Sequence, residues 1–315
     1  MRKAAARGDA AGSRSTAPVL IGLTSIRGRE RALKRTLDSL LRQSLPPDAR
    51  PVSLHLFLSH DPYLLDLGFT ALPRFLQNRQ CQSRQRGIQL HCHFVENTGS
   101  YRKLLPLIGL LDDRTTALDP YLITADDDTL YPRNWLRRLL NAQDRLNCVV
   151  GFRGRRMVVE EGRIAPYHRW IKHDPTLTEP HPLTVPTGKD GICYRLSQLH
   201  RDVLNWRQAL QLAGHADDLW FKHHSLLLGV PSALLNASLS LEFPELTAAG
   251  RRIRPHRKSQ APHSLFLTIN KRGGNDAVLE RLMDASIYPL SGKQGQPSGS
   301  SLKPASAGSR RPAVG

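Results

Sequence analysis

The sequence is poor in aromatic residues, in cysteine and in long apolar runs. Phe, Trp and Tyr make up 6% of its 315 residues, and its four cysteines form no C-x-x-C pair. A disulfide framework is not expected at this length, and a structural zinc site needs closer ligand spacing. No apolar run approaches the roughly 20 residues of a membrane span, and residues 17–23 are too short and wrongly flanked for a signal peptide. We expect a cytoplasmic protein, with at most peripheral contact at the inner face of a membrane.

Two glycine-rich phosphate motifs are also missing. Neither G-x-G-x-x-G nor G-x-x-x-x-G-K-[ST] occurs in the sequence. Their absence disfavours a nicotinamide dehydrogenase and a P-loop NTPase, because both classes cradle phosphates on such loops. The segment His91-Cys92-His93 has metal-binding residue types, but residues 88–95 alternate as a strand does, with both histidines on one face. We predict a structural strand there.

Acidic residues are few, and the formal net charge is +18. Residues 1–16 and 291–315 are basic and rich in small residues, which predicts two disordered tails around one domain at 17–290. Such a basic chain favours anionic partners. The basic run 251–258 fits donor phosphate, an anionic membrane surface or a merely solvated loop. Because aromatics are scarce and 7 of the 18 net charges lie in the tails, no specific nucleic acid is expected.

Apolar strand-like segments alternate with helical patterns over the first half of the chain. The predicted strands are 18–23, 52–58, 88–95 and 121–124. This alternation predicts an α/β fold with a mostly parallel sheet flanked by helices. In such a sheet the loops at the carboxyl ends of the strands face one crevice, which is the ligand side.

Three consecutive aspartates, Asp126, Asp127 and Asp128, follow the fourth predicted strand; we call them the acidic triplet. The Asp-x-Asp spacing offers oxygen ligands from Asp126 and Asp128 to a hard cation such as Mg²⁺ or Mn²⁺. A polar turn with an Asp helix cap is the simpler alternative. Pro132 is expected as the first residue of the next helix.

A second acidic pair, Asp217 and Asp218, precedes an apolar helical segment, and a glycine-containing loop at 186–191 lies between the two acidic groups. A carboxylate there can serve as a general base. Its alternative is an Asp that caps a helix N-terminus.

Five motifs in order, spread over residues 18–231, resemble those of GT-A-fold glycosyltransferases of the family-2-like bacterial type. They are Leu23-Thr-Ser-Ile-Arg27, Asn97-Thr-Gly-Ser-Tyr-Arg-Lys-Leu-Leu-Pro106, Ala125-Asp-Asp-Asp-Thr-Leu-Tyr-Pro132, Pro186-Thr-Gly-Lys-Asp-Gly-Ile-Cys-Tyr194 and Ala216-Asp-Asp-Leu-Trp-Phe-Lys222. The resemblance implies a GT-A (Rossmann-like) mixed sheet. It also implies a metal-dependent, inverting transfer of sugar from a nucleotide-diphosphate sugar to a glycan or lipid-linked acceptor.

The resemblance also implies residue roles. Asp128, with Asp126 or Asp127, would hold Mn²⁺ or Mg²⁺, and Asp126 would contact the donor ribose. Asp218 would be the base, and Asp217 would orient it or the acceptor. Many relatives have Glu at the position of Asp217. The change to Asp keeps a carboxylate there.

Further donor contacts are assigned to Thr24, Arg27, Asp61 and Lys103, each with a turn or surface role as the alternative. The candidate substrate loop comprises Gly188, Lys189, Asp190 and Gly191, and its Lys-Asp pair departs from the small or apolar residues expected there. His256 or His263 is a candidate third metal ligand. Trp220 fits either a sugar platform or the core.

Two other functions remain open from sequence. A nucleotidyltransferase that makes sugar nucleotides would use a similar sheet, but it needs a basic, Gly-rich early loop that residues 24–29 match poorly. A basic nucleic-acid-binding protein without enzymatic activity would fit the charge alone.

Overall fold

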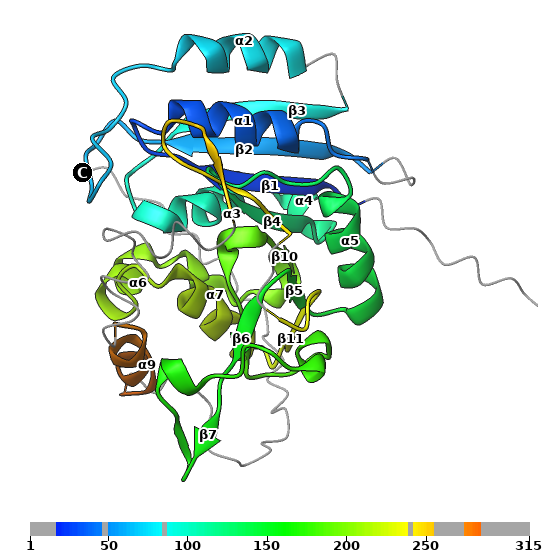
Figure 1. The fold of residues 1–315 in the computed structure, drawn as a ribbon, viewed down its shortest axis with the longest axis vertical. Helices are drawn as coiled ribbons and strands as arrows, with labels where there is room; N and C mark the ends of the chain where they lie inside the picture. Colours follow the sequence, from blue (N-terminus) through cyan, green and yellow to red (C-terminus); the bar gives the residue numbers. More distant parts are fainter. Residues whose placement is uncertain (1–16, 46–49, 84–86, 239–241, 255–273, 285–315) are drawn as a thin grey trace, which may run out of the picture.

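The structure, a computed structural model, describes residues 17–45, 50–83, 87–238, 242–254 and 274–284 (Figure 1). Both predicted tails lie outside the described residues, as do His256 and His263. The basic run 251–258 is described only as far as residue 254.

A seven-stranded sheet forms the centre of the molecule. Its strands, in spatial order, are β11 (Ser232–Leu234), β5 (Val149–Gly151), β10 (Ile192–Arg195), β4 (Tyr121–Asp126), β1 (Val19–Thr24), β2 (Val52–Leu58) and β3 (Ile88–Phe94). Within this sheet β10 runs antiparallel to β4 and β5, and the other described pairings are parallel. The predicted α/β class with a mixed, mostly parallel sheet is confirmed.

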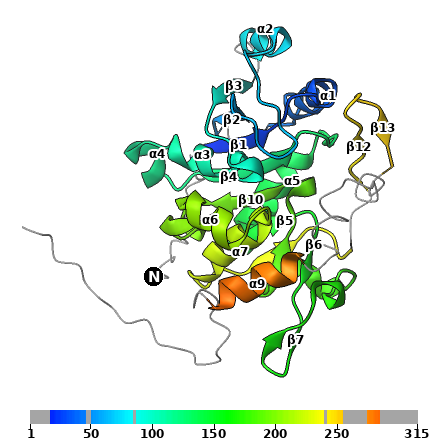
Figure 2. The ribbon, with the colours of Figure 1, turned by 90° about the vertical axis from the view of Figure 1, so that its left-hand side faces the viewer.

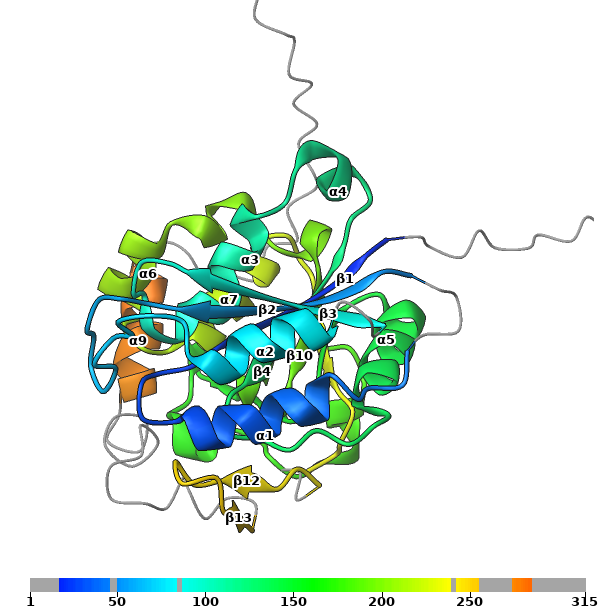
Figure 3. The same cartoon turned by 90° about the horizontal axis from the view of Figure 1, so that it is seen from above.

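Helices cover both faces of the sheet, as the view from above shows (Figure 3). One face carries α1 (Glu30–Leu40), α2 (Arg74–Ser83) and α5 (Trp135–Leu146), and the other carries α3 (Leu105–Gly109), α6 (Trp206–Leu212) and α7 (Asp217–Leu226). Leu33, Leu37 and Leu40 of α1 are fully buried, because their spacing places them on one side of the helix. The two faces therefore have separate apolar cores.

The remaining described elements complete the fold. They are η1 (Gly99–Lys103), α4 (Asp113–Ala117), β6 (Gly154–Arg156), β7 (Val159–Glu160), β8 (Arg163–Ile164), η2 (Tyr167–Arg169), η3 (Pro175–Thr178), β9 (Thr184–Pro186), η4 (Gly188–Asp190), η5 (Leu196–Gln198), η6 (Arg201–Leu204), β12 (Glu245–Leu246), β13 (Arg252–Ile253) and α9 (Gly274–Asp284). Figure 2 shows α9 beside α6 and α7. Arg281 of α9 donates a hydrogen bond to the carbonyl of Leu212, the last residue of α6. None of the described helices combines the length and apolarity needed to cross a membrane.

One predicted helix start is wrong. The helix after the acidic triplet begins at Trp135, three residues beyond Pro132. The backbone carbonyl of Pro132 instead accepts hydrogen bonds from the amide N–H of Trp135 and the side chain of Gln43. Pro132 therefore closes the turn before the helix.

The strand prediction for His91 and His93 is confirmed, because both lie in β3. His55 of β2 stands opposite His91, and its Nδ1 lies 3.1 Å from Nε2 of His93. Across the described residues, no group of three or more His, Cys, Asp and Glu side chains is arranged to hold a metal ion.

Candidate active site

The pairing of β1 with β4 places the first acidic group at the carboxyl edge of the sheet. Thr24 and Asp126 are register partners and end their strands together. The amide N–H of Asp126 donates to the hydroxyl of buried Tyr131, at 2.8 Å. The first aspartate of the triplet thus ends a strand, and Tyr131 holds the turn that carries the other two.

Lys103 joins the two acidic groups that are far apart in sequence. Its Nζ lies 3.3 Å from Oδ1 of Asp126 and 3.0 Å from Oδ2 of Asp217. Burial alone would lower the pKa of Lys103, but the charges of Asp126, Asp217 and Asp218 raise it well above its usual value. Lys103 is therefore a fixed cation at the centre of three carboxylates, which we call the Lys103 cluster.

A glycine in β1 lets Lys103 approach the sheet. A Cβ on Gly22 would lie 1.9 Å from the backbone carbonyl oxygen of Lys103. Any side chain at this position would push η1 away from β1. Gly22 was not predicted as a site residue, because its role depends on a contact with a segment about 80 positions later.

Asp218 carries a carboxyl group whose pKa lies near neutral pH. Burial, followed by the charge of Asp217, raises its pKa to about 7, although Lys103 and the backbone N–H of Gly188 act in the opposite direction. Oδ1 of Asp218 accepts a hydrogen bond from that N–H at 3.1 Å. A base whose pKa lies near the working pH combines availability with proton affinity.

The helix-cap alternative for the second acidic pair is not supported. Asp217 and Asp218 are the first two residues of α7, and the capping position is held by Ala216, which makes no side-chain cap. The carboxylate of Asp217 instead pairs with Lys103.

The remaining two aspartates of the triplet contact residues that the sequence did not single out. The hydroxyl of Ser25 donates to Oδ2 of Asp127 at 2.5 Å. Nη1 of Arg29 lies 3.0 Å from Oδ1 of Asp127 and 3.5 Å from Oδ2 of Asp128. Ser25 and Arg29 lie in or next to the first quoted motif, and that proximity was the only signal in the sequence.

The predicted donor contacts at the β1 and β2 ends are dispersed. The hydroxyl of Thr24 donates to the carbonyl of Phe57, while the side chains of Arg27 and Asp61 are exposed. Within the described part of the chain, the side chains of these three residues form no hydrogen bond or ion pair with the Lys103 cluster.

A buried ion pair at this edge was missed. Asp66 and Arg102 are 2% and 1% exposed, and their side chains lie 2.9 Å apart. Asp66 also accepts from the backbone N–H of Arg27 at 3.2 Å. The pair fastens the loop after β2 to η1, one residue before Lys103.

The two ends of the candidate substrate loop have different surroundings. Gly188 lies against the Lys103 cluster, and residues 189–191 are held by contacts with the rest of the protein. A Cβ on Gly188 would lie 2.6 Å from Nζ of Lys103 and 3.2 Å from Oδ1 of Asp218. Lys189 is ion-paired with Asp190 at 3.0 Å and with Glu245 at 3.3 Å. These pairs anchor the loop to the protein.

The anchored end rests on the first helix after the triplet. The indole N–H of Trp135 donates to the carbonyl of Asp190 at 2.8 Å. Gly191 has φ +99°, and a Cβ there would lie 2.6 Å from the Trp135 ring. The second loop glycine therefore permits both the backbone conformation and the close approach of the ring.

Asp126 and Asp128 are suitable donors for a hard cation, because Mg²⁺ and Mn²⁺ prefer carboxylate oxygens. Their side chains are 32% and 16% exposed, so ligands from solvent or substrate can complete the coordination. The two candidate histidine ligands fall outside the described residues. The donor set thus fits an ion shared with bound phosphate, which is the usual mode for Mg²⁺.

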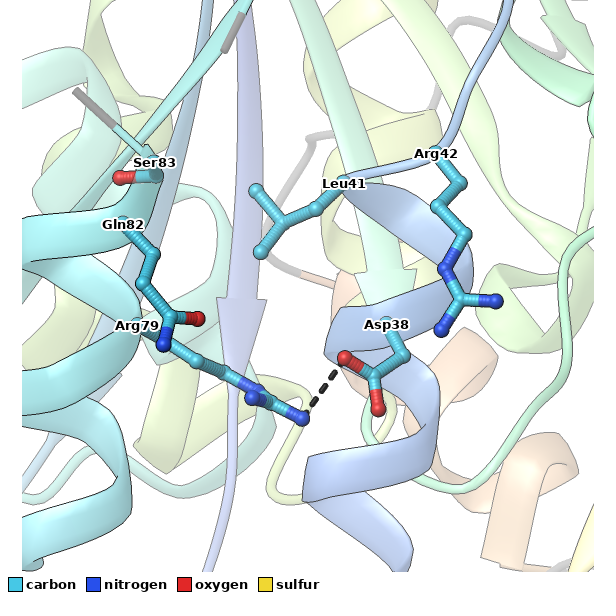
Figure 4. Close-up of a pocket in the computed structure, with 6 residues that line it drawn as sticks. All are labelled: Asp38, Leu41, Arg42, Arg79, Gln82 and Ser83. Atoms are coloured by element: carbon cyan, nitrogen blue, oxygen red, sulfur yellow. Dashed lines mark ion pairs between the residues drawn. The ribbon is translucent and has the colours of Figure 1, made fainter. Parts of the chain in front are cut away.

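A separate cavity of about 210 Å³ lies between α1 and α2 (Figure 4). Arg79 and Asp38 form an ion pair of 2.6 Å across it. Its lining residues are Asp38, Leu41, Arg42, Arg79, Gln82 and Ser83. None of them belongs to the Lys103 cluster or contacts the triplet.

Trp220 is part of the core. It is fully buried, and its indole N–H donates to the carbonyl of Val203 at 2.9 Å. A sugar platform at this position is therefore excluded.

No protein-family model matches the chain, and no curated protein matches it. Among solved structures, the chain is similar to S. aureus TarS 1–349, with 14% identity and a TM-score of 0.42, over 70% of this chain and 59% of that one. The same protein in complex with UDP-GlcNAc has 14% identity and a TM-score of 0.39, over 70% and 57%. S. aureus TarS without that truncation has 13% identity and a TM-score of 0.39, over 71% and 37%. The chain thus spans less than two thirds of each of these proteins.

Proposed function

We propose that the chain is a metal-dependent, inverting glycosyltransferase that moves a sugar from a nucleotide-diphosphate sugar to a glycan or lipid-linked acceptor. The observation that carries the proposal is the Lys103 cluster. It contains Asp218, a carboxyl with a pKa of about 7, together with Asp126, the residue at which β4 ends and the acidic triplet begins. The motif resemblance to GT-A enzymes supports the same reaction class.

In this mechanism the hydroxyl oxygen of the acceptor attacks the anomeric carbon of the donor sugar. Asp218 accepts the proton of that hydroxyl during the attack. The bond between that carbon and the diphosphate oxygen breaks, and the electron pair leaves with the diphosphate. Attack from the side opposite the leaving group inverts the anomeric centre. The N–H of Gly188 orients the base, and Asp217 holds Lys103 beside it.

The leaving diphosphate needs positive charge. Lys103 and Arg29 each form an ion pair with the triplet, and in this proposal they supply positive charge to an anion bound at the sheet edge. A Mg²⁺ or Mn²⁺ ion bound by Asp126 and Asp128 would supply further Lewis-acid stabilisation when present.

The test is Asp218→Asn, which keeps the shape of the side chain and removes the base. We expect transfer to fall by about 10²–10⁴-fold, with thermal unfolding and nucleoside-diphosphate binding retained. The matched control is Asp202→Asn, because Asp202 is exposed and lies outside the cluster. Near-normal turnover in a folded Asp218→Asn protein would overturn the assignment of the base.

The donor class and the cation are tested together by a thermal-shift screen of nucleoside diphosphates with and without Mn²⁺. A ligand that binds only the folded state raises the melting temperature. We expect a larger shift with Mn²⁺ present, and that increment should disappear in Asp128→Ala. If no nucleoside diphosphate shifts the melting temperature, the proposed donor class is wrong.

A further inference from the structure

Arg155, in the middle of β6, pairs with no carboxylate within the described part of the chain. Its Cζ lies 4.3 Å from the centre of the Tyr167 ring, and its Nη1 lies 3.5 Å from the backbone carbonyl oxygen of Tyr167. Arg169, in the same part of the fold, is instead ion-paired with Glu160 at 2.6 Å. Arg155 is only partly exposed, so water alone does not surround its charge.

The ring of Tyr167 is a firm support for the guanidinium. The backbone N–H of Tyr167 donates to Oδ1 of Asp276 in α9 at 2.7 Å. Its ring packs edge-on against buried Trp170, with ring centroids 4.9 Å apart. A guanidinium that stacks on a fixed aromatic face keeps its N–H edge available for a planar anion.

The strand that carries Arg155 runs beside the backbone that contacts the proposed base. β6 pairs with β9, and the carbonyl of Arg153 accepts a hydrogen bond from the N–H of Thr187 at 2.9 Å. The next residue, Gly188, donates its N–H to Oδ1 of Asp218 at 3.1 Å. Arg155 therefore stands two residues from a position that is hydrogen-bonded into the surroundings of the base.

The phenol of Tyr167 lies within electrostatic range of both Arg155 and Asp218. Burial is the largest cause that raises the pKa of Tyr167; the charge of Arg155 lowers this pKa, and the charge of Asp218 raises it. The guanidinium, the aromatic ring and the base thus belong to one neighbourhood. A molecule whose hydroxyl reaches Asp218 from this side would meet Arg155.

The cations around Asp218 have different partners. Lys103 and Arg29 are ion-paired with the acidic triplet, where the proposed leaving group would bind. Among the described residues, Arg155 forms no hydrogen bond or ion pair with the triplet or the Lys103 cluster. Its charge is therefore available to a group other than the leaving diphosphate.

We propose that Arg155, supported by Tyr167, binds an anionic group of the acceptor, a phosphate or a carboxylate, beside the hydroxyl that reacts at Asp218. A guanidinium pairs with either anion through two parallel N–H bonds, and such charge-assisted bonds are roughly twice as strong as neutral ones. A phosphate would belong to a lipid-linked acceptor and a carboxylate to an acidic glycan. That the bound molecule is the acceptor rests on the proposed function; anion binding at Arg155 does not.

The test is isothermal titration calorimetry, without a donor, of three compounds that share one sugar ring. They are an alkyl glucoside, the same glucoside bearing a phosphate, and the matching alkyl glucuronide. We expect the wild type to bind a charged compound roughly tenfold or more tightly than the neutral one, and Arg155→Gln to lose that preference. Tighter binding of the phosphate compound would indicate a lipid-linked acceptor, and tighter binding of the glucuronide an acidic glycan.

Two further variants separate the loss of this contact from general effects. Arg169→Gln removes a charge from the same part of the fold, where Glu160 already pairs it, and should keep the preference. Arg155→Lys keeps the charge without the planar fork and should retain part of the preference. A misfolded Arg155→Gln would instead show a lowered melting temperature.

Three results would overturn the proposal. They are equal dissociation constants of the three compounds for the wild type, the same preference in Arg155→Gln as in the wild type, and an equal loss in Arg169→Gln. Asp218→Asn should lose sugar transfer and keep the preference for the charged compound. A failure of the proposed chemistry and a failure of the anion site are therefore distinguishable.

Discussion

Two buried lysines, Lys103 at the end of η1 and Lys222 within α7, lie in contrasting surroundings. Lys103 is placed among Asp126, Asp217 and Asp218, and its pKa is raised despite burial. Lys222, in the middle of α7, donates to the hydroxyl of Ser232 at 2.9 Å, and burial lowers its pKa to about 7.

The difference shows what distinguishes the candidate site from the core. Burial penalises the charge of both lysines, and only Lys103 has carboxylates close enough to outweigh that penalty. A lysine that keeps its charge in a buried place can act on an anionic substrate. Lys222 has a hydroxyl as its neutral partner and fits a structural role.

Among the variants that test the contrast between the two lysines, the largest effect is expected from Lys103→Met. Loss of this cation should lower kcat/KM by roughly 10²-fold or more, as removal of one preorganised electrostatic group commonly does. Steady-state kinetics with a donor selected by the nucleoside-diphosphate screen measures the change. Lys34→Met, on the exposed side of α1, is the control. Equal kcat/KM values for Lys103→Met and Lys34→Met would mean that Lys103, like Lys222, has only a structural role.

A smaller effect is expected from Gly188→Ala. The added Cβ would lie 2.6 Å from Nζ of Lys103, so the amine must move away from its carboxylates. We expect roughly a tenfold loss of kcat/KM, because small displacements of catalytic groups are costly, with little change in melting temperature. Gly109→Ala is the control, since a Cβ there meets nothing within 4 Å. An unchanged kcat/KM in Gly188→Ala would show that the Lys103 position is not critical.

The strand–helix alternation of the first 130 residues was predictable because the strands are apolar runs, as in β1 and β4, or alternate in polarity, as in β3, and because helices such as α1 have a clear apolar face. The helix after the triplet was misplaced by three residues because Pro132 serves a turn instead of a helix start. The two acidic groups were also predictable as residues. Their connection through Lys103 was not, because it depends on η1 packing against Gly22.

The contacts of Arg29 and Asp66 could not be predicted from the sequence for a similar reason. Charged side chains are frequent in this basic chain, and spacing alone does not show which of them become buried. Only the fold brings Arg29 to the triplet and Arg102 to Asp66.

The smallest effect is expected from Lys222→Met, which should change the pH dependence of the free energy of unfolding. The pKa of Lys222 is about 7 in the folded protein and near 10.5 when exposed, so between these values the unfolded chain binds more protons and stability falls as pH falls. Lys222→Met should remove up to about 1.4 kcal/mol per pH unit of this dependence. Urea unfolding at about pH 7.5 and about pH 9.5 measures it. Parallel dependence in wild type and variant would mean that Lys222 is not held neutral.

The most direct test of the account is the pH dependence of kcat/KM for sugar transfer. Asp218 must be deprotonated to act as the base, and its pKa is about 7, so activity should rise with pH through an inflection near 7. Because Lys103 lowers the pKa of Asp218, the inflection should move to higher pH in Lys103→Met. An inflection near pH 4, the usual range of an aspartate, or one that Lys103→Met leaves in place, would contradict the account.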